Sequence, residues 1–219
     1  MVIYITINRK KEISLREELY ILRCEVLDER NPKMLTALRD LATSYGDLGD
    51  YQRKAELLEK LYVLKCEILG ESHSSVISLL NDLALAYGMF DCKKKAELEE
   101  KGFLLGRKYL GEKHSTTLMF LNNLAVAYRE LGEHQKEVEY LERLYTLRCE
   151  MRGEKDLDTL MSLRSLACAY DHLDNSEKGA ELRDKFYALR HDYLEEVRSD
   201  PQSSDGWYAA LYKILHGGE

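Results

Sequence analysis

The pattern Leu-Ala-x-x-Tyr decides the fold of this sequence, and it occurs four times. It reads LATSY at 41–45, LALAY at 83–87, LAVAY at 124–128 and LACAY at 166–170. The four tyrosines are 42, 41 and 42 residues apart, and apolar residues on both sides keep the same register. Each copy carries apolar residues at i, i+3, i+6, i+7, i+10 and i+13, which is the spacing of one helix face. The sequence therefore predicts a first helix that recurs along the chain.

A second helical segment follows each first helix, and one further copy precedes them all. The copies share a column of large apolar side chains, formed by Leu19, Leu61, Phe103, Leu144 and Phe186. The chain has 13 glycines and 2 prolines, a scarcity that favours long helices joined by short turns. Side-chain oxygens suited to cap two of the first helices come from Ser74, Ser75, Ser115 and Thr116.

Helix pairs that each touch only their neighbours build an α-solenoid, so we predict an all-α fold of this kind. In it, the small alanine of the pattern allows close helix approach, and the tyrosine hydroxyl reaches a polar edge. A single array is expected over 10–216, with a half-repeat at 10–28, repeats at 33–69, 74–110, 115–152 and 156–198, and a C-terminal capping helix at 203–216. Residues 1–9 contain a β-branched run and are expected to form an N-terminal tail or short strand.

Composition excludes several classes of protein. Hydrophobic residues make up 45% of the chain, which is enough for a folded core, yet no apolar run is long enough to span a membrane. The net charge of -7 argues against nucleic acid as the main partner. Five cysteines without a C-x-x-C pair favour a reducing compartment, and no secretory signal is recognisable at the start, so we expect a cytoplasmic protein.

The helix–turn–helix unit with this signature resembles the tetratricopeptide repeat. Its period and the strings LGESHSSVISLLNDLALAY and LGEKHSTTLMFLNNLAVAYRELGEH resemble the long-repeat branch found in kinesin light chains. The resemblance covers about residues 10–216 and implies a right-handed superhelix that serves as a binding scaffold. The chain departs from the family where large residues replace a small one in the second helices. Gly102 and Gly106 also cost about 1 kcal/mol each relative to alanine, which predicts a repeat that is locally loose or bent.

The resemblance also implies where a ligand binds, because the first helices of such arrays line a concave groove. The predicted peptide-binding residues in this groove are Arg39, Asn81, Asn122, Arg129 and Arg164. Asparagine amides suit the backbone of an extended peptide, and arginine holds a carboxylate with two hydrogen bonds, so an acidic peptide is favoured. The alternative is that these side chains only form the solvated face of amphipathic helices.

Other reactive residues are assigned structural roles. Cys24, Cys66 and Cys149 share one column but lie on separate helix pairs, too far apart for disulfides, and they are expected to be half-buried packing residues. His73 and His114 fall in matching turns, where cap contacts are favoured over a pH-sensitive pair. No catalytic constellation, cofactor motif or metal-binding motif is recognisable, so we expect no enzyme, no cofactor and no metal site.

The sequence thus favours a non-enzymatic scaffold that binds an extended peptide of a protein partner, with no nucleic acid and no membrane involved. Two alternatives stay open. The chain is a structural segment of a larger array, or a homo-oligomer joined through exposed array ends, since the half-repeat leaves an apolar face uncovered. The other alternative is a regulatory protein that senses a peptide, although no output module is recognisable.

Overall fold

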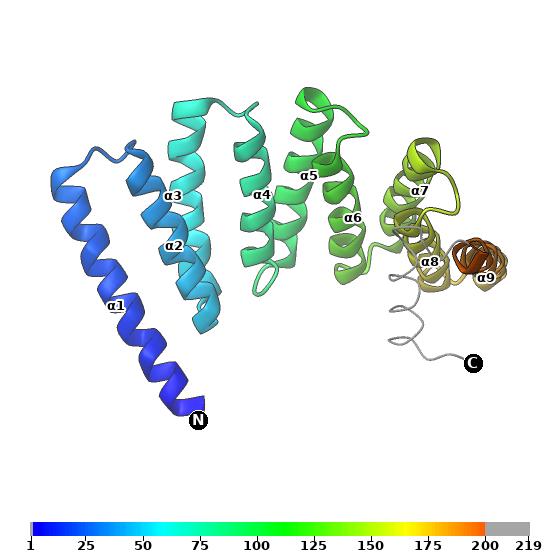
Figure 1. Ribbon diagram of the computed structural model, residues 1–219, viewed down its shortest axis with the longest axis horizontal. Helices are drawn as coiled ribbons and strands as arrows, with labels where there is room; N and C mark the ends of the chain where they lie inside the picture. The colour runs from blue at the N-terminus through cyan, green and yellow to red at the C-terminus, as the bar shows by residue number, and fades with distance from the viewer. Residues whose placement is uncertain (1, 200–219) are drawn as a thin grey trace. The chain divides into compact units, whose positions relative to one another are not determined.

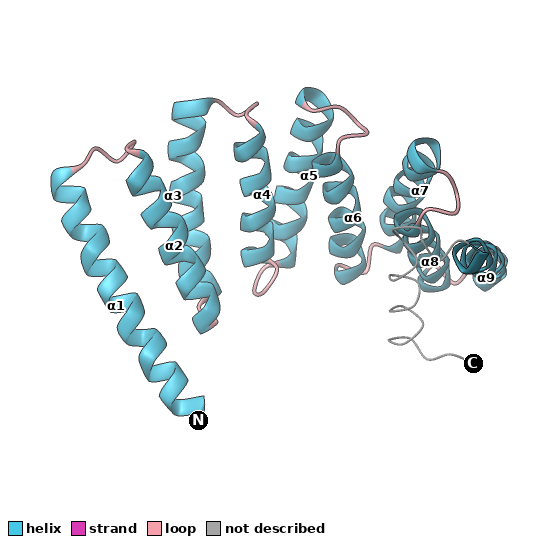
Figure 2. Cartoon of the chain, in the orientation of Figure 1, coloured by secondary structure: helices cyan, strands magenta, loops and turns pink. Residues whose placement is uncertain are grey.

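The structure is a computed structural model that describes the backbone of residues 2–199 and the side chains of residues 11–196. All regular elements in this part of the chain are α-helices, joined by short loops (Figure 1, Figure 2). They are α1 (Val2–Val26), α2 (Pro32–Leu48), α3 (Tyr51–Leu69), α4 (Ser74–Tyr87), α5 (Cys92–Tyr109), α6 (Ser115–Glu130), α7 (His134–Arg152), α8 (Leu157–His172) and α9 (Ser176–Ser199). The capping helix predicted at 203–216 lies outside the described residues.

The helices belong to two compact units, Met1–Gly132 and Glu133–Glu219, which are described separately. In the first unit α1 to α6 follow one another, and each packs mainly against the helices before and after it in the chain. In the second unit α7 packs on α8, and α8 packs on α9. This neighbour-to-neighbour packing is the arrangement of a repeat protein.

The start of the chain differs from the prediction. Residues 2–9 form the first turns of α1 and not the tail or short strand that the sequence indicated. β-Branched residues lower helix propensity only slightly. A helix also grows easily from turns that already exist, because nucleation is its costly step. The long helical segment that follows therefore extends through this stretch.

The ends of the helices follow the local sequence. Asp50 and Asp91 cap α3 and α5 by accepting hydrogen bonds from backbone N–H groups of the first turn. His73 and His114 occupy the same position before α4 and α6, where Nδ1 of each ring accepts from a backbone N–H two residues on. The cap role predicted for these histidines is confirmed, while the serines and threonine expected to cap these helices lie inside the first turn.

The columns of the repeat form the core. The leucines of the Leu-Ala-x-x-Tyr pattern are all at most 4% exposed, and the alanines beside them are at most 2% exposed. These residues are Leu41, Leu83, Leu124 and Leu166, with Ala42, Ala84, Ala125 and Ala167. Equivalent positions thus have equivalent surroundings in both units, as a repeat architecture requires.

The tyrosine of the pattern ties α2, α4 and α8 to the helix that precedes each of them. The hydroxyl of Tyr87 donates to Oε1 of Glu59 over 2.6 Å. Tyr45 makes the same bond to Glu17, and Tyr170 makes it to Glu142. The carboxylate bond and burial together raise the pKa of Tyr87 to about 12, so this hydroxyl keeps its proton as a donor. The predicted polar contact of the tyrosine is confirmed at these positions.

Two glycines of α5 lie close against side chains of α6. A Cβ at Gly102 would lie 2.2 Å from the ring of Phe120, and one at Gly106 would lie 2.9 Å from Oγ1 of Thr117. Both glycines are buried, and α5 runs without a break through them. The two glycines do not interrupt the helix. The missing side chains make room for α6, and this packing offsets the low helix propensity of glycine.

Candidate functional site

The predicted peptide-binding residues all lie on first helices, but they are divided between the two units. Arg39 belongs to α2, Asn81 to α4, and Asn122 and Arg129 to α6, all in the first unit. Arg164 belongs to α8 in the second unit. Of the residues in the first unit, Arg39 and Asn81 take part in side-chain contacts between neighbouring first helices, described next.

A ladder of polar contacts runs across the first helices α2, α4 and α6. Nη2 of Arg39 lies 3.5 Å from Oδ2 of Asp82, and Nδ2 of Asn123 donates to Oδ1 of Asn81 over 2.8 Å. Both contacts join the same two columns of the repeat, because Arg39 corresponds to Asn81 and Asp82 corresponds to Asn123. We call these four residues the first-helix ladder. It places side chains from three repeats side by side.

The ladder still has binding capacity. The hydrogen bond from Asn123 uses only the carbonyl oxygen of Asn81, so with respect to residues 11–196 the NH2 group of Asn81 keeps its two donors for a ligand. The Arg39–Asp82 pair is about half exposed on both sides. Exposed pairs of this kind contribute at most about 1 kcal/mol, so a ligand carboxylate can replace Asp82 at little cost.

A buried carboxyl group, that of Glu99, is hydrogen-bonded to Asn123 of the first-helix ladder. Glu99 of α5 is fully buried, and its Oε1 accepts a hydrogen bond from Nδ2 of Asn123 over 3.1 Å. Its other oxygen, Oε2, is buried and has no hydrogen-bond partner among residues 11–196. Burial raises the pKa of Glu99 to about 8, although the bond from Asn123 and the charge of Lys95 lower it. Glu99 is therefore largely protonated at neutral pH, which avoids an unpaired charge in the core.

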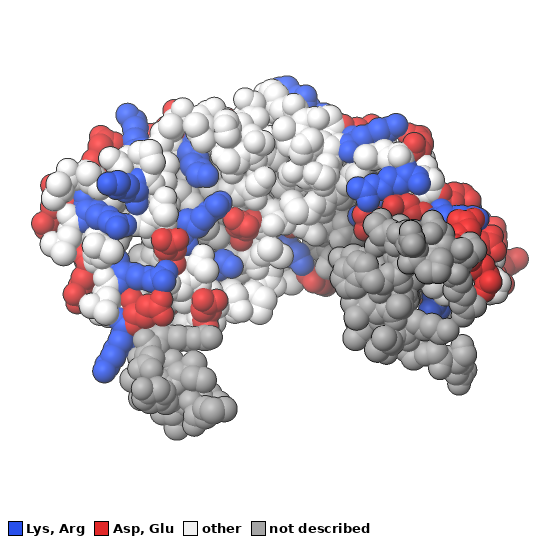
Figure 3. Space-filling model, in the orientation of Figure 1, with Lys and Arg blue, Asp and Glu red and all other residues white. Residues whose placement is uncertain are grey.

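Apolar side chains lie next to the amides of the ladder. Leu85 is 52% exposed and stands one turn after Asn81 on α4, which places both on the same helix face. Val126 has the same relation to Asn122 on α6 and is half-buried. Figure 3 shows one face of the molecule, where acidic and basic residues are intermixed over α1 to α3 and neutral residues prevail over α4 to α6. The first unit thus offers apolar and amide groups together.

Arg129 and Arg164 are both exposed. Within residues 11–196 neither guanidinium group forms an ion pair, so both are available to an acidic ligand. The backbone of Arg129 helps to end α6, because its carbonyl oxygen accepts from Gly132. Arg164 of α8 stands at the same position of the repeat as Arg39 of α2.

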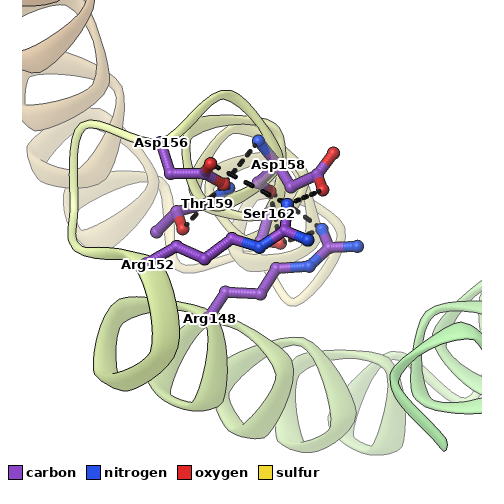
Figure 4. A network of polar contacts seen from close by, with 6 residues as sticks. All are labelled: Arg148, Arg152, Asp156, Asp158, Thr159 and Ser162. Atoms are coloured by element: carbon purple, nitrogen blue, oxygen red, sulfur yellow. Dashed lines mark hydrogen bonds and ion pairs between the residues drawn. The ribbon is translucent and has the colours of Figure 1, made fainter. Parts of the chain in front are cut away.

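Sequence reasoning missed a polar network that fixes the start of α8 (Figure 4). Nη1 of Arg148 donates to the backbone oxygen of Asp158 over 2.8 Å and to Oγ of Ser162 over 2.6 Å. Arg152 binds Oδ2 of Asp158 over 2.9 Å. Burial lowers the pKa of the Arg148 guanidinium, although the nearby aspartates oppose this effect. The network holds α7 against α8, the helix that carries Arg164, and the sequence pattern did not indicate it.

The cysteines remain thiols in this structure. All five are free, with Cys66 and Cys149 half-buried as predicted and Cys24 exposed. The one group of side chains among the described residues that could hold a metal lies elsewhere, in the second unit, and consists of His134, Glu137 and His172. The sequence did not reveal it, because His172 is distant in the chain and no metal-binding motif joins the three.

Comparison with known proteins agrees with the packing and the repeat. The sequence profile described as tetratricopeptide repeat matches residues 34–75 and 117–158. The chain carries tetratricopeptide repeats. Such repeats generally mediate interactions with other proteins and are usually not catalytic. No curated protein matches the chain.

Solved tetratricopeptide structures show the same fold. TPR-like repeats of the kinesin-light-chain type from Podosopora anserina are 25% identical, over 90% of each chain, with a TM-score of 0.73. A variant of that protein gives a TM-score of 0.74 at 25% identity, over 85% of this chain and 89% of that one. BtubC from P. vanneervenii is 20% identical, over 84% of this chain and 74% of its own, with a TM-score of 0.68. The predicted all-α solenoid of kinesin-light-chain-like repeats is confirmed.

None of the helices in residues 2–199 combines the length and the apolar character needed to cross a bilayer.

Proposed function

We propose that this chain is a non-enzymatic scaffold that binds an extended segment of a partner protein against its first helices. The proposed contact residues of the first unit are Arg39, Asn81, Asn122 and Arg129, and Arg164 is the proposed contact residue of the second unit, taken by itself. The first-helix ladder is the observation that carries this proposal. It presents unused amide donors of Asn81 beside the exposed Leu85, which suits a peptide backbone followed by an apolar side chain.

The same residues favour a segment that contains carboxylates. Arg39 already holds one carboxylate, that of Asp82, in an exposed and replaceable contact. Arg129 and Arg164 are exposed cations without an ion-pair partner among residues 11–196. Electrostatic complementarity of this kind speeds association and selects the partner more than it adds affinity.

The test compares binding by the full chain and by two variants. The partner is first captured from native lysate, its bound segment is mapped by mass spectrometry, and a synthetic peptide of that segment is titrated. Asn81→Ala/Asn122→Ala removes the amides, and Arg39→Glu/Arg164→Glu reverses the charges. Each lost hydrogen bond costs about 0.5–1.5 kcal/mol, so we expect Kd to rise roughly 5-fold to 150-fold for the asparagine variant.

A matched control is available on the second helices. Gln52 and Gln135 are exposed amide residues at equivalent positions of α3 and α7. The Gln52→Ala/Gln135→Ala variant should bind the peptide as the natural chain does. Equal affinity of all variants would remove the first helices from consideration as the binding face.

A second candidate function is self-association through α1. Four exposed apolar side chains on this helix lie at spacings of four, three and four residues, as in the seam of a coiled coil: Leu15, Leu19, Leu22 and Val26. In sedimentation experiments an α1-mediated dimer would dissociate on dilution, and the Leu15→Lys/Leu22→Lys variant would stay monomeric. A monomer at all concentrations would leave only the peptide-binding scaffold.

A further inference from the structure

We propose that His134, Glu137 and His172 form a binding site for a divalent transition metal, with Zn2+ as the fitting ion. His134 and Glu137 lie one turn apart at the start of α7, and His172 is the last residue of α8. All three belong to the second unit, so the site lies within one compact body. The ligand atoms of the three side chains lie within 4.8 Å of one another.

The distances agree with those of a coordination sphere. Nδ1 of His134 lies 3.1 Å from Oε2 of Glu137, and Nδ1 of His172 lies 3.2 Å from the same oxygen. Ligand atoms of a tetrahedral zinc site, at bond lengths of about 2.0–2.1 Å, are about 3.3 Å apart. The remaining pair, one nitrogen from each imidazole, lies within 4.8 Å, so zinc binding requires the two rings to move closer together.

The exposure of the three side chains also suits a metal site. Glu137 is 2% exposed, whereas the side chains of His134 and His172 are 33% and 39% exposed. The fixed carboxylate supplies the negative charge from inside, and the imidazoles leave a path by which an ion enters from solvent. Two nitrogens and one oxygen are a donor set that zinc accepts, with water as a fourth ligand, and that Mg2+ does not prefer.

The preceding repeat shows what is unusual about these residues. The structure starts α5 at Cys92 and α7 at His134, so equivalent positions of these helices are 42 residues apart, and Gly102 rather than Phe103 corresponds to Leu144. At this offset Cys92, Lys95 and Glu130 replace His134, Glu137 and His172. Nζ of Lys95 lies 2.7 Å from Oε2 of Glu130, so the buried ammonium group of Lys95 is paired with the carboxylate of Glu130. Within the described residues Glu137 forms ion pairs only with the two histidines, whose rings lie 5.3 Å apart. A dication would compensate the buried carboxylate as the lysine–glutamate pair does in the other repeat.

The equivalent pair also provides a variant that should fold without binding metal. Glu137→Lys/His172→Glu installs the lysine–glutamate pair of the preceding repeat in the same register. A second variant, His134→Ala, removes one ligand and leaves the contact between Glu137 and His172 in place. Circular dichroism of both variants checks that the helices are formed before any metal is added.

The experiment is calorimetric titration of Zn2+ into the full chain, kept reduced and free of chelators, with Mg2+ as the comparison ion. We expect one Zn2+ per chain that is absent from the lysine–glutamate variant and bound at least 10-fold more weakly by His134→Ala. Saturating Zn2+ should also raise the Tm of the natural chain by about 5–10 °C at 100 times Kd, and leave the Tm of the lysine–glutamate variant unchanged.

Binding by the free cysteines is distinguished with Co2+. The proposed site gives the visible bands of tetrahedral Co2+ with nitrogen and oxygen ligands and no sulfur-to-cobalt charge-transfer band in the near ultraviolet. Such a charge-transfer band, an unchanged Zn2+ stoichiometry in the lysine–glutamate variant, or no Zn2+ binding by the natural chain would each overturn the proposal. The last two outcomes would identify the three residues as a structural ion pair between α7 and α8.

Discussion

Replacing Glu99 by glutamine should stabilise the protein relative to the natural chain, and this difference in the free energy of unfolding should grow as the pH rises. Burial raises the pKa of this carboxyl from 4.5 to about 8 in the folded state, so folding favours its neutral form. Below pH 4.5 the group is protonated in both the folded and the unfolded chain, so its ionisation does not lower the free energy of unfolding. Between pH 4.5 and 8 only the unfolded chain loses the proton, so stability falls as the pH rises.

The magnitude follows from the two pKa values. One pKa unit corresponds to about 1.36 kcal/mol, so the full cost above pH 8 is about 5 kcal/mol. Glutamine has the same shape, accepts the bond from Asn123 through its oxygen, and carries no charge at any pH. The stability of Glu99→Gln relative to the natural chain should therefore increase by about 3 kcal/mol between pH 5 and pH 8.

The assay is urea unfolding followed by circular dichroism at several pH values, with the midpoints compared at constant slope. Glu97→Gln is the matched control, because Glu97 lies on the same helix but is 67% exposed and pairs with Lys94. The control should change stability by less than about 1 kcal/mol at every pH. Parallel pH profiles of Glu99→Gln and the natural chain would refute the assignment of a neutral, buried carboxyl behind the first-helix ladder.

Two further changes test the packing of the repeats. Gly102→Ala should lower the free energy of unfolding by about 1–3 kcal/mol because its methyl group meets Phe120, and adding Phe120→Leu should recover part of this loss in a double-mutant cycle of thermal or urea unfolding. A simple additive loss would show that the ring is not the obstacle. Tyr87→Phe should cost about 0.5–1.5 kcal/mol in the same assay through the lost bond to Glu59, whereas a neutral result would mean that solvent replaces this bond fully.

Much of the fold could be predicted because the same pattern of buried apolar positions occurs in four repeats. The leucine and alanine columns and the tyrosine each recur at one helical register, so a single interpretation explained many residues. The start of α1 could not be predicted from β-branched composition, since the propagation of an existing helix outweighs weak local propensities. The effect of Gly102 and Gly106 could not be predicted for a related reason. Their low helix propensity is a local property, but their packing against Phe120 and Thr117 depends on another helix.

The candidate site was only partly accessible to sequence reasoning. Periodicity placed Arg39 and Asn81 on first helices, but it did not reveal their contacts with Asp82 and Asn123, which depend on the offset between neighbouring helices. Glu99 looked like any surface carboxylate of a charged helix. Its burial follows from the close approach of α5 and α6, and only the folded chain shows it.

The grouping of His134, Glu137 and His172 also depends on the packing of neighbouring helices, but in this case the sequence contains a usable signal. Two of these residues replace the buried Lys95–Glu130 pair at the equivalent positions of the repeat. Comparing the repeats position by position for changes of charge, rather than for shared apolar residues, is therefore the signal that would have found them.

The most direct test of the central claim is the response of the asparagine side chains to a partner peptide. Two-dimensional 15N spectra resolve the side-chain amides, and single Asn→Ala variants assign those of Asn81 and Asn122. The account predicts that peptide binding shifts these two signals while the amide of Gln52 on a second helix stays in place. Shifts confined to Gln52, with Asn81 and Asn122 unmoved at saturation, would contradict it.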